Sequence, residues 1–315
     1  MLGGTAFLSR SVAADAVARG HEVVCAARGV SGLVPHGATL LRWDRGEEAP
    51  ELDGFDAAVD VARLPSHVRS AVAAVPGAHW VFVSTINVYA DDSTPGGRPG
   101  VTPLREPLDE DVDPGTSPEA YGRMKVACEE IVRQGTASAT IVRPGLIVGP
   151  GDPTGRFSYW PRRLANGGEV LAPADPADVV QVIDVRDLAA WIVTLAERRR
   201  GGTFDGVGEP MPIERALRSG SPDAHLVWVG QEFLESQDVQ PWAGEDSIPL
   251  WLPRPEYDGM MHHDVEPALE ADLLLRPLAD TYADTLAWLR SDPGATVTGI
   301  DSDRERELLT AWKRW

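Results

Sequence analysis

Cysteine is scarce in this chain, and long apolar runs are missing. The 315 residues include two cysteines, Cys25 and Cys128, which lack the paired spacing of metal or redox motifs. We therefore expect two free, buried thiols. No apolar stretch approaches the roughly 18 residues that a membrane-spanning helix needs, so the sequence predicts no membrane segment.

The start of the chain and its charge exclude further classes of protein. No basic segment leads into an apolar stretch and a cleavage site, so we expect a cytoplasmic protein. The formal net charge of −19 repels the phosphates of nucleic acids and anionic membranes, which leaves a small-molecule substrate as the expected partner. His262 and His263 are adjacent and lack the spacing of helical metal ligands, so no metal site is expected.

Helical and strand patterns alternate along the first two thirds of the chain. The apolar spacing predicts buried strands and amphipathic helices in turn. Strands that alternate with helices form parallel crossovers, with helices on both faces of the sheet. The sequence therefore predicts an α/β fold with a doubly wound (Rossmann) parallel sheet. The predicted helices are 7–20, 65–76 and 121–134, the strands are 21–27, 38–43, 56–62, 79–84 and 139–151, and a strand and helix share 179–197.

The composition changes beyond about residue 151. Eight of the ten tryptophans lie there, among Pro-rich connections. Large aromatics in irregular structure indicate a smaller C-terminal lobe that closes over a ligand. We expect the Rossmann domain to comprise 1–150 and about 179–205, and the substrate-binding lobe about 151–178 and 206–315. A long surface loop is expected over 91–118.

The opening "MLGGTAFLSR" places two glycines before a helix. A dinucleotide-binding turn needs a tight bend and a close backbone approach to the pyrophosphate at the helix N-terminus. One form of this turn has the pattern G-x-x-G-x-x-G. Here Gly3 matches its first glycine, while Ala6 and Ser9 stand at the second and third glycine positions. Only Met1 and Leu2 precede the turn, so the first strand is represented by its last residues at most. Plain loop geometry is the alternative explanation.

The next predicted strand carries information about the cofactor. It ends in Ala26, Ala27 and Arg28, with no carboxylate to bind the ribose 2′-hydroxyl of NAD. An arginine at this position suits the 2′-phosphate of NADP. The pattern favours NADP, with NAD as the alternative. The explanation of Arg28 that involves no cofactor is a solvated arginine at a strand end.

Tyr121 and Lys125 lie four residues apart, on one face of a predicted helix. A tyrosine with a pKa near 10 is a poor acid-base catalyst at neutral pH, but a nearby ammonium favours its phenolate. Thr85 follows the buried strand 79–84, where its hydroxyl could hold a substrate oxygen. Ser84 is the weaker candidate for that role.

Several segments occur in the order found in one known family. The glycine turn, "FVSTINVYA", "YGRMK", "IVRPGLIVGPGD" and "VQVIDVRDLA" resemble the extended short-chain dehydrogenase/reductase superfamily, in its NAD-dependent epimerase/dehydratase branch. The resemblance extends to about residue 205. It implies that Thr85 is a hydroxyl donor, Tyr121 the acid-base group and Lys125 the cation that orients the cofactor. Ile86 and Asn87 replace the Asp-Glu pair of the dehydratases, which disfavours sugar dehydration.

The resemblance also implies binding residues and an activity. We expect an NADP-dependent oxidoreductase or epimerase acting on a nucleotide sugar or a small polar carbonyl or alcohol metabolite. Relatives commonly pair through helices of the first domain, which is compatible with a homodimer. The expected cofactor neighbours are Gly3, Thr5, Ala6, Phe7, Leu8, Arg28, Ala62, Lys125, Pro144, Gly145 and Leu146. The expected substrate neighbours are Asn87, Arg156, Tyr159 and Trp160, of which the last three suit a packed lobe boundary equally well.

Two alternatives to an enzyme stay open. The first is a non-catalytic dinucleotide-binding sensor or scaffold that kept the fold, which the eroded glycine motif suggests. The second is an RNA-associated protein, which the acidic charge disfavours.

Overall fold

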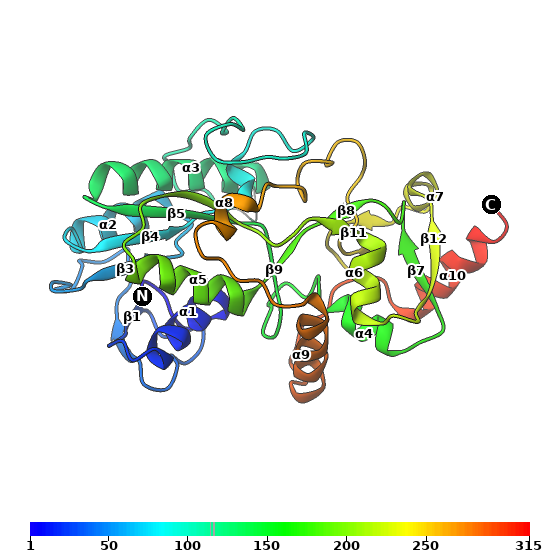
Figure 1. Ribbon diagram of the computed structural model, residues 1–315, viewed down its shortest axis with the longest axis horizontal. Helices are drawn as coiled ribbons and strands as arrows, with labels where there is room; N and C mark the ends of the chain where they lie inside the picture. The colour runs from blue at the N-terminus through cyan, green and yellow to red at the C-terminus, as the bar shows by residue number, and fades with distance from the viewer. Residues whose placement is uncertain (114, 116) are drawn as a thin grey trace.

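The larger lobe is built on a parallel sheet (Figure 1). The computed structural model describes residues 1–113, 115 and 117–315. Two strands pair in parallel on one side of the sheet, β1 (Val24–Ala27) and β2 (Thr39–Arg42). On the other side lie β3 (Ala57–Asp60), β4 (His79–Val83), β5 (Ala139–Pro144) and β10 (Gly202–Gly206), also parallel.

Residues 1–3 occupy the position between these two groups. Leu2 forms parallel bridges with both Ala26 of β1 and Asp60 of β3. Its amide donates to the Val59 carbonyl at 2.8 Å, and the Gly3 amide donates to the Ala26 carbonyl at 2.9 Å. The sheet order is therefore β2, β1, Leu2, β3, β4, β5, β10, and the first turn leaves from the centre of the sheet.

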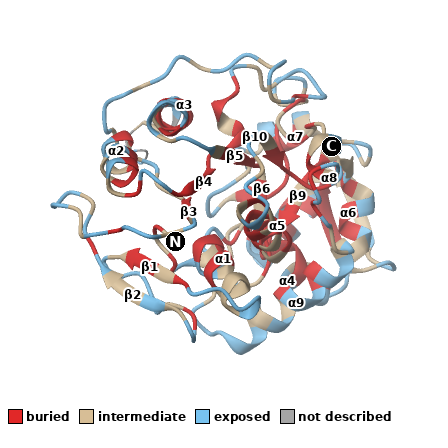
Figure 2. Ribbon diagram, turned by 60° about the vertical axis from the view of Figure 1, so that its left-hand side comes forward, coloured by how far each residue is buried: buried red, intermediate tan, exposed pale blue. Residues whose placement is uncertain are grey.

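Helices cover both faces of this sheet. Figure 1 shows α1 (Phe7–Ala18) and α5 (Val185–Glu197) below it, and α2 (Pro65–Ala74) and α3 (Pro118–Gly135) above it. Alternate residues of β4 point to the two sides: Val81 packs in the core with α1 and α5, and Trp80 packs in the core with α2 and α3. The predicted doubly wound α/β fold is confirmed, and Figure 2 shows the strands β3 to β5 as its buried centre.

Several element boundaries differ from the expected ones. β1 begins at Val24, after the exposed residues His21 and Glu22. The expected strand 139–151 is divided into β5 and β6 (Leu146–Val148). Helix α3 begins at Pro118, inside the expected loop 91–118, where a proline suits the first turn of a helix. Residues 114 and 116 of that loop lie outside the described residues.

The smaller lobe combines short helices with paired strands around its own core (Figure 1). β6 pairs with β9 (Val182–Asp184) near the junction of the lobes. β7 (Glu169–Pro173) pairs with β12 (His225–Val229), β8 (Val179–Val180) with β11 (Met211–Pro212), and β13 (Gln240–Pro241) with β14 (Ser247–Ile248). The helices are α4 (Tyr159–Ala165), α6 (Ile213–Gly220), α7 (Gln231–Ser236), α9 (Leu278–Ser291) and α10 (Ser302–Trp312).

One segment crosses back to the larger lobe. Residues 265–275, which include α8 (Glu266–Leu269), were expected in the smaller lobe but pack against the core around α5 and β10. Val265 and Leu273 are buried there, and the indole of Trp191 donates to the Ala271 carbonyl at 2.7 Å. The apolar side chains of this return segment complete the first core.

Two expectations about the whole chain can be compared with the structure. Cys25 and Cys128 are free and buried, as predicted. Among the described helices, none combines the length and hydropathy that crossing a membrane requires.

Candidate active site

A cavity of about 270 Å³ lies at the carboxyl edge of the sheet, where the two lobes meet. Phe7, at the start of α1, and Gly145 and Leu146, which follow β5, line it from the larger lobe. Asn87, on the short 3₁₀ helix η1 (Ile86–Val88), also lines it. The cavity therefore brings together residues from separate segments that the sequence predicts to bind cofactor or substrate.

Thr85 and Tyr121 meet at this cavity. The Thr85 hydroxyl donates a hydrogen bond to the Tyr121 oxygen and accepts one from the Asn87 amide at 3.2 Å. Burial raises the pKa of Tyr121, and the hydrogen bond from Thr85 acts in the opposite direction. The phenol is thus a neutral proton donor, placed beside a second hydroxyl that lines the same cavity. Ser84 is buried and does not line it.

Gly122 allows this meeting. A methyl group at Gly122 would lie 2.0 Å from the Asn87 carbonyl oxygen, so any larger residue would push α3 away from η1. The glycine in "YGRMK" therefore lets the helix that carries Tyr121 approach the segment that carries Thr85.

Lys125 lies one helical turn beyond Tyr121 and is 1% exposed. Its ammonium donates to the carbonyls of Ala62, at 2.7 Å, and Val83, and it lies 4.2 Å from the centre of the Phe82 ring. Burial lowers the pKa of Lys125 to about 8. An ammonium has three donors, so one remains for a ligand.

Arg63 is a second cation at this place, and sequence reasoning missed it. It follows Ala62 directly after β3, and its positive charge lowers the pKa of Tyr121, opposing the effect of burial. The signal that could have found it is its position at the carboxyl end of a strand beside the expected cofactor residue Ala62.

A buried chain of polar groups connects α3, β5 and β10. Arg143 donates to both carboxylate oxygens of Glu129 at 2.9 and 2.7 Å, and to the Tyr89 hydroxyl at 3.0 Å. Tyr89 donates to Asp205 at 2.7 Å, and His263 shares a 3.1 Å contact with the same carboxylate. Burial alone would raise the pKa of Glu129, but the hydrogen bonds and charge of Arg143 lower it overall. Arg143 thus holds α3 and β5 together.

The glycine turn leads into α1 at the carboxyl edge of the sheet. Ala6 precedes the helix without a side-chain cap, which leaves the first N–H groups of α1 free. The Ser9 hydroxyl donates to the Ala6 carbonyl at 2.8 Å, so it is accommodated within the first turn of the helix. Free N–H groups and the positive end of a twelve-residue helix fit a pyrophosphate.

The remaining expected cofactor residues lie in different places. The side chain of Leu8 is buried in the core, and Pro144 is the last residue of β5, paired with Gly206. Ala62 offers its carbonyl to Lys125. Arg28 is exposed just beyond β1. Gly3 and Thr5 belong to the turn between Leu2 and α1.

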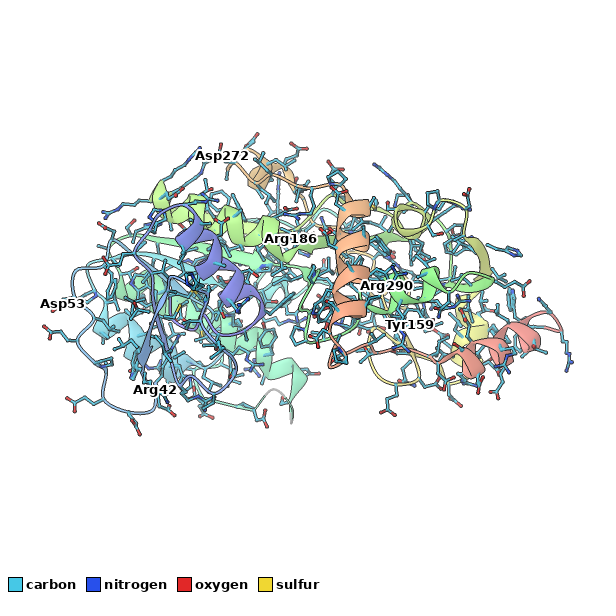
Figure 3. The ribbon with its side chains drawn as sticks, turned by 90° about the horizontal axis from the view of Figure 1, so that it is seen from below. Arg42, Asp53, Tyr159, Arg186, Asp272 and Arg290 are labelled. Atoms are coloured by element: carbon cyan, nitrogen blue, oxygen red, sulfur yellow. The ribbon has the colours of Figure 1, made fainter. Side chains whose placement is uncertain are left out.

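The expected substrate residues are divided by the structure. Arg156 and Asn87 line the cavity. Tyr159 and Trp160, on α4, are buried in the core of the smaller lobe instead, and the Trp160 indole donates to the Pro249 carbonyl at 2.9 Å. Figure 3 shows Tyr159 within the half of the molecule formed by the smaller lobe. The position of these two residues fits the alternative expectation, packing at a lobe boundary, rather than contact with a substrate.

Other lining residues come from parts of the chain without a recognisable motif. Gln181 follows β8, Trp242 follows β13, and Met260 and Met261 lie in the connection before the return segment. Each lies in irregular structure, where no periodic pattern marks the side chains that point inward. Among the described residues, no group of His, Cys, Asp and Glu is arranged to hold a metal ion.

Comparison with known families agrees with this arrangement. Residues 66–205 match the model of the NAD dependent epimerase/dehydratase family. This segment is similar to that family. The matched segment of this chain includes Thr85, Tyr121 and Lys125. The match confirms the resemblance that the sequence motifs indicate. The family is one of NAD-dependent enzymes. A search of curated proteins finds no similar sequence.

Solved structures share the fold over nearly the whole chain. UDP-N-acetylglucosamine 4-epimerase from Bacillus cereus is 16% identical, with a TM-score of 0.62 over 91% of this chain and 97% of the other. The Bordetella bronchiseptica enzyme WbmH, solved in complex with NAD+, is 17% identical, with a TM-score of 0.56 over 92% and 97%. TunA, an NAD-dependent NDP-hexosamine 5,6-dehydratase, is 19% identical, with a TM-score of 0.62 over 92% and 96%. At these identities the likeness concerns the fold.

Proposed function

We propose that this chain is an NADP-dependent oxidoreductase or epimerase that interconverts an alcohol and a carbonyl group. The observation that carries the proposal is the hydrogen-bonded pair of Thr85 and Tyr121 in a cavity beside the cofactor turn. Two of the structural neighbours are named for nucleotide sugars, and a small polar carbonyl or alcohol metabolite is the other substrate class considered. The protein acts on a small molecule rather than on nucleic acid, and a cytoplasmic location and a homodimer belong to the same proposal.

The residues of the cavity divide the reaction between them. NADP(H), held at the free N–H groups of α1, would supply or accept the hydride. The hydroxyls of Thr85 and Tyr121 hold the substrate oxygen from two directions. As the carbon of a carbonyl substrate is reduced, Tyr121 gives its proton to the oxygen. Lys125 and Arg63 supply positive charge that stabilises the phenolate left behind.

Two exposed arginines support the choice of NADP. Arg42 is the register partner of Ala27, so Arg28 and Arg42 lie at the same carboxyl edge, on neighbouring strands. Within the part of the chain that the structure describes, neither guanidinium has a carboxylate partner. Figure 3 shows Arg42 at the edge of the larger lobe, in the half opposite Tyr159. Unpaired arginines there suit a 2′-phosphate.

Replacement of Tyr121 tests the chemistry. Tyr121→Phe removes the transferable proton while keeping the ring, so turnover should fall by about 10²- to 10⁴-fold with cofactor affinity nearly unchanged. Steady-state kinetics on a panel of carbonyl compounds, with fluorescence titration of NADPH, measures both. Tyr257→Phe, which changes a tyrosine of the smaller lobe that does not line the cavity, is the control. Full activity of Tyr121→Phe would exclude this mechanism.

Titration with each cofactor tests the nucleotide preference. We expect saturable binding of NADPH that is tighter than that of NADH, and loss of this preference in Arg28→Ala. Arg69→Ala, which changes an exposed arginine paired with Asp109, should leave it intact. Preferential binding of NADH would overturn the choice of NADP but keep the enzyme. Binding of neither, after bound cofactor has been removed during purification, would favour a non-catalytic descendant of the fold.

A further inference from the structure

Arg156 presents the open edge of its guanidinium to the cavity. Its Nε donates to the Thr154 hydroxyl at 3.3 Å, and that hydroxyl donates to Asp152 at 3.0 Å. Among the contacts of the described residues, the two terminal nitrogens of Arg156 have no partner. A guanidinium held by Nε leaves a planar fork that matches the two oxygens of a carboxylate.

Trp242 supports this guanidinium from one face. The Arg156 Cζ lies 4.7 Å from the centre of the Trp242 ring, within the range of a cation–π contact. Trp242 has a φ of +69°, a left-handed conformation that is unfavourable for a bulky residue. Its amide donates to the Trp251 carbonyl at 3.0 Å, which helps to hold the strained residue. Strain of this kind persists where the fold needs a side chain in one place.

The charged side chains that line the cavity form one pair. Among the described residues that line it, Arg156 is the one cation and Asp152 the one carboxylate. Asp152 is 1% exposed and already accepts two hydrogen bonds from Thr154. Burial raises the pKa of Asp152 and lowers the pKa of Arg156, and the charge of each residue offsets this effect on the other only in part. A ligand anion on the fork would compensate the charge of Arg156.

We propose that Arg156, stacked on Trp242, binds a carboxylate of the substrate, which makes the substrate a compact oxo acid or hydroxy acid. This inference rests on the proposed function. The cavity of about 270 Å³ is smaller than the roughly 300–1,000 Å³ of pockets that hold drug-sized ligands, and Arg156 is the one cation among the described residues that line it. A phosphate monoester carries about 1.5 to 2 negative charges, which a single guanidinium leaves partly uncompensated.

The reaction that follows is balanced in atoms and electrons. In the reductive direction the carbonyl carbon of the oxo acid gains a hydride from NADPH, and its oxygen gains the Tyr121 proton. The products are a hydroxy acid and NADP+, and solvent returns a proton to Tyr121. The carboxylate stays on Arg156 throughout and takes no part in the bond changes.

Matched pairs of substrates test the clamp. Succinate semialdehyde and levulinate are each compared with their methyl esters, using NADPH and measuring kcat/KM. We expect the wild type to prefer the acids, and Arg156→Gln to lower kcat/KM for the acids by about 10- to 100-fold more than for the esters. Arg156→Lys keeps the charge without the fork, so its kcat/KM for the acids should lie between those of the wild type and Arg156→Gln. Arg215→Gln changes an exposed arginine outside this cavity and should behave as the wild type.

The outcomes separate this inference from the proposed function. Equal turnover of acids and esters by the wild type, or equal losses for both in Arg156→Gln, would overturn the clamp but keep a Tyr121-dependent reductase. If nothing is reduced, calorimetric titration with levulinate and its ester decides. Binding of the acid that Arg156→Gln abolishes supports the clamp, and absence of such binding overturns it. Preference for a phosphorylated aldehyde such as glyceraldehyde phosphate would overturn the carboxylate assignment. Equal thermal midpoints establish that the variants are folded.

Discussion

Lys125 is one of two lysines in a chain with 29 lysine and arginine residues. The other, Lys313, pairs with Glu169 on the surface at 2.6 Å. Arginine supplies almost all other positive charge, and it stays protonated at any ordinary pH. At the position beside Tyr121 the chain instead carries a compact ammonium, whose pKa burial lowers to about 8. The charge at this position therefore depends on pH within the range of an enzyme assay.

The pH dependence of activity follows from that pKa. The ammonium form of Lys125 exists below about pH 8 and is lost as the pH rises through this value. In the proposed mechanism this ammonium stabilises the Tyr121 phenolate, so kcat/KM should decline on the alkaline side with a midpoint near pH 8. Lys125→Met should lower activity throughout and remove this decline, whereas Lys313→Met should keep the wild-type profile. A profile that stays flat to pH 10 would contradict the role of Lys125.

Individual residues differ in how well the sequence predicts their positions. Tyr121 and Lys125 could be placed on one face because helical periodicity determines which residues are neighbours. Tyr159 and Trp160 could not be placed, because a large aromatic side chain suits a core as well as a cavity, and both lie in the core. Arg63 escaped notice because a single exposed arginine at a strand end has no local pattern.

The contact between α3 and η1 determines the geometry of the reactive pair. Thr85 caps η1 by accepting from the Asn87 amide, and Gly122 lets α3 approach the Asn87 carbonyl. The distance between the two hydroxyls therefore depends on the absence of one methyl group.

Gly122→Ala tests this dependence. The added methyl would lie 2.0 Å from a backbone oxygen, so α3 must shift and the hydrogen bond between Thr85 and Tyr121 should lengthen. Because misplacement by about 1 Å can cost about 10²-fold in rate, we expect kcat/KM to fall by about 10- to 100-fold. Gly135→Ala, at the far end of the same helix, meets only the Val72 side chain and should keep activity even if stability falls. Equal activity of the two variants would contradict this account.

The elements themselves were largely predictable, and their ends were less so. Strong apolar runs such as "HWVFVS" correspond to β4, because a strand covered on both faces needs continuous apolar residues. The start of α3 was misplaced by three residues, since the proline-rich loop before it masks the helical pattern. The return segment was assigned to the wrong lobe, because its position depends on packing between residues far apart in the sequence.

The two lobes are joined through buried polar groups as well as apolar ones. Asp205, on β10 of the larger lobe, binds Tyr89 and also His263, which precedes the return segment. Gln181, beside the cavity, accepts from the His263 amide at 2.9 Å and donates to the Gly208 carbonyl at 2.8 Å. The packing of the lobes and the lining of the cavity therefore share residues.

Asp205→Ala should destabilise the whole molecule. It leaves the buried Tyr89 hydroxyl and His263 without their acceptor, which should lower the free energy of unfolding by about 3 kcal/mol. Asp56→Ala removes an exposed carboxylate that pairs with Arg199 at 3.3 Å. This variant should change the free energy of unfolding by less than about 1 kcal/mol. Urea unfolding measures both. Similar values for the two variants would show that the buried chain contributes little.

The return segment also has a consequence for how the chain reaches its native state. Its residues complete the core beneath α5, yet they follow most of the smaller lobe in sequence. During synthesis the chain emerges from its N-terminus, so the larger lobe lacks part of its core until residue 275 has left the ribosome. The larger lobe is therefore synthesised first but cannot complete its folding before most of the smaller lobe has been synthesised. Until then, the apolar surface around Trp191 lacks its cover and is prone to aggregation.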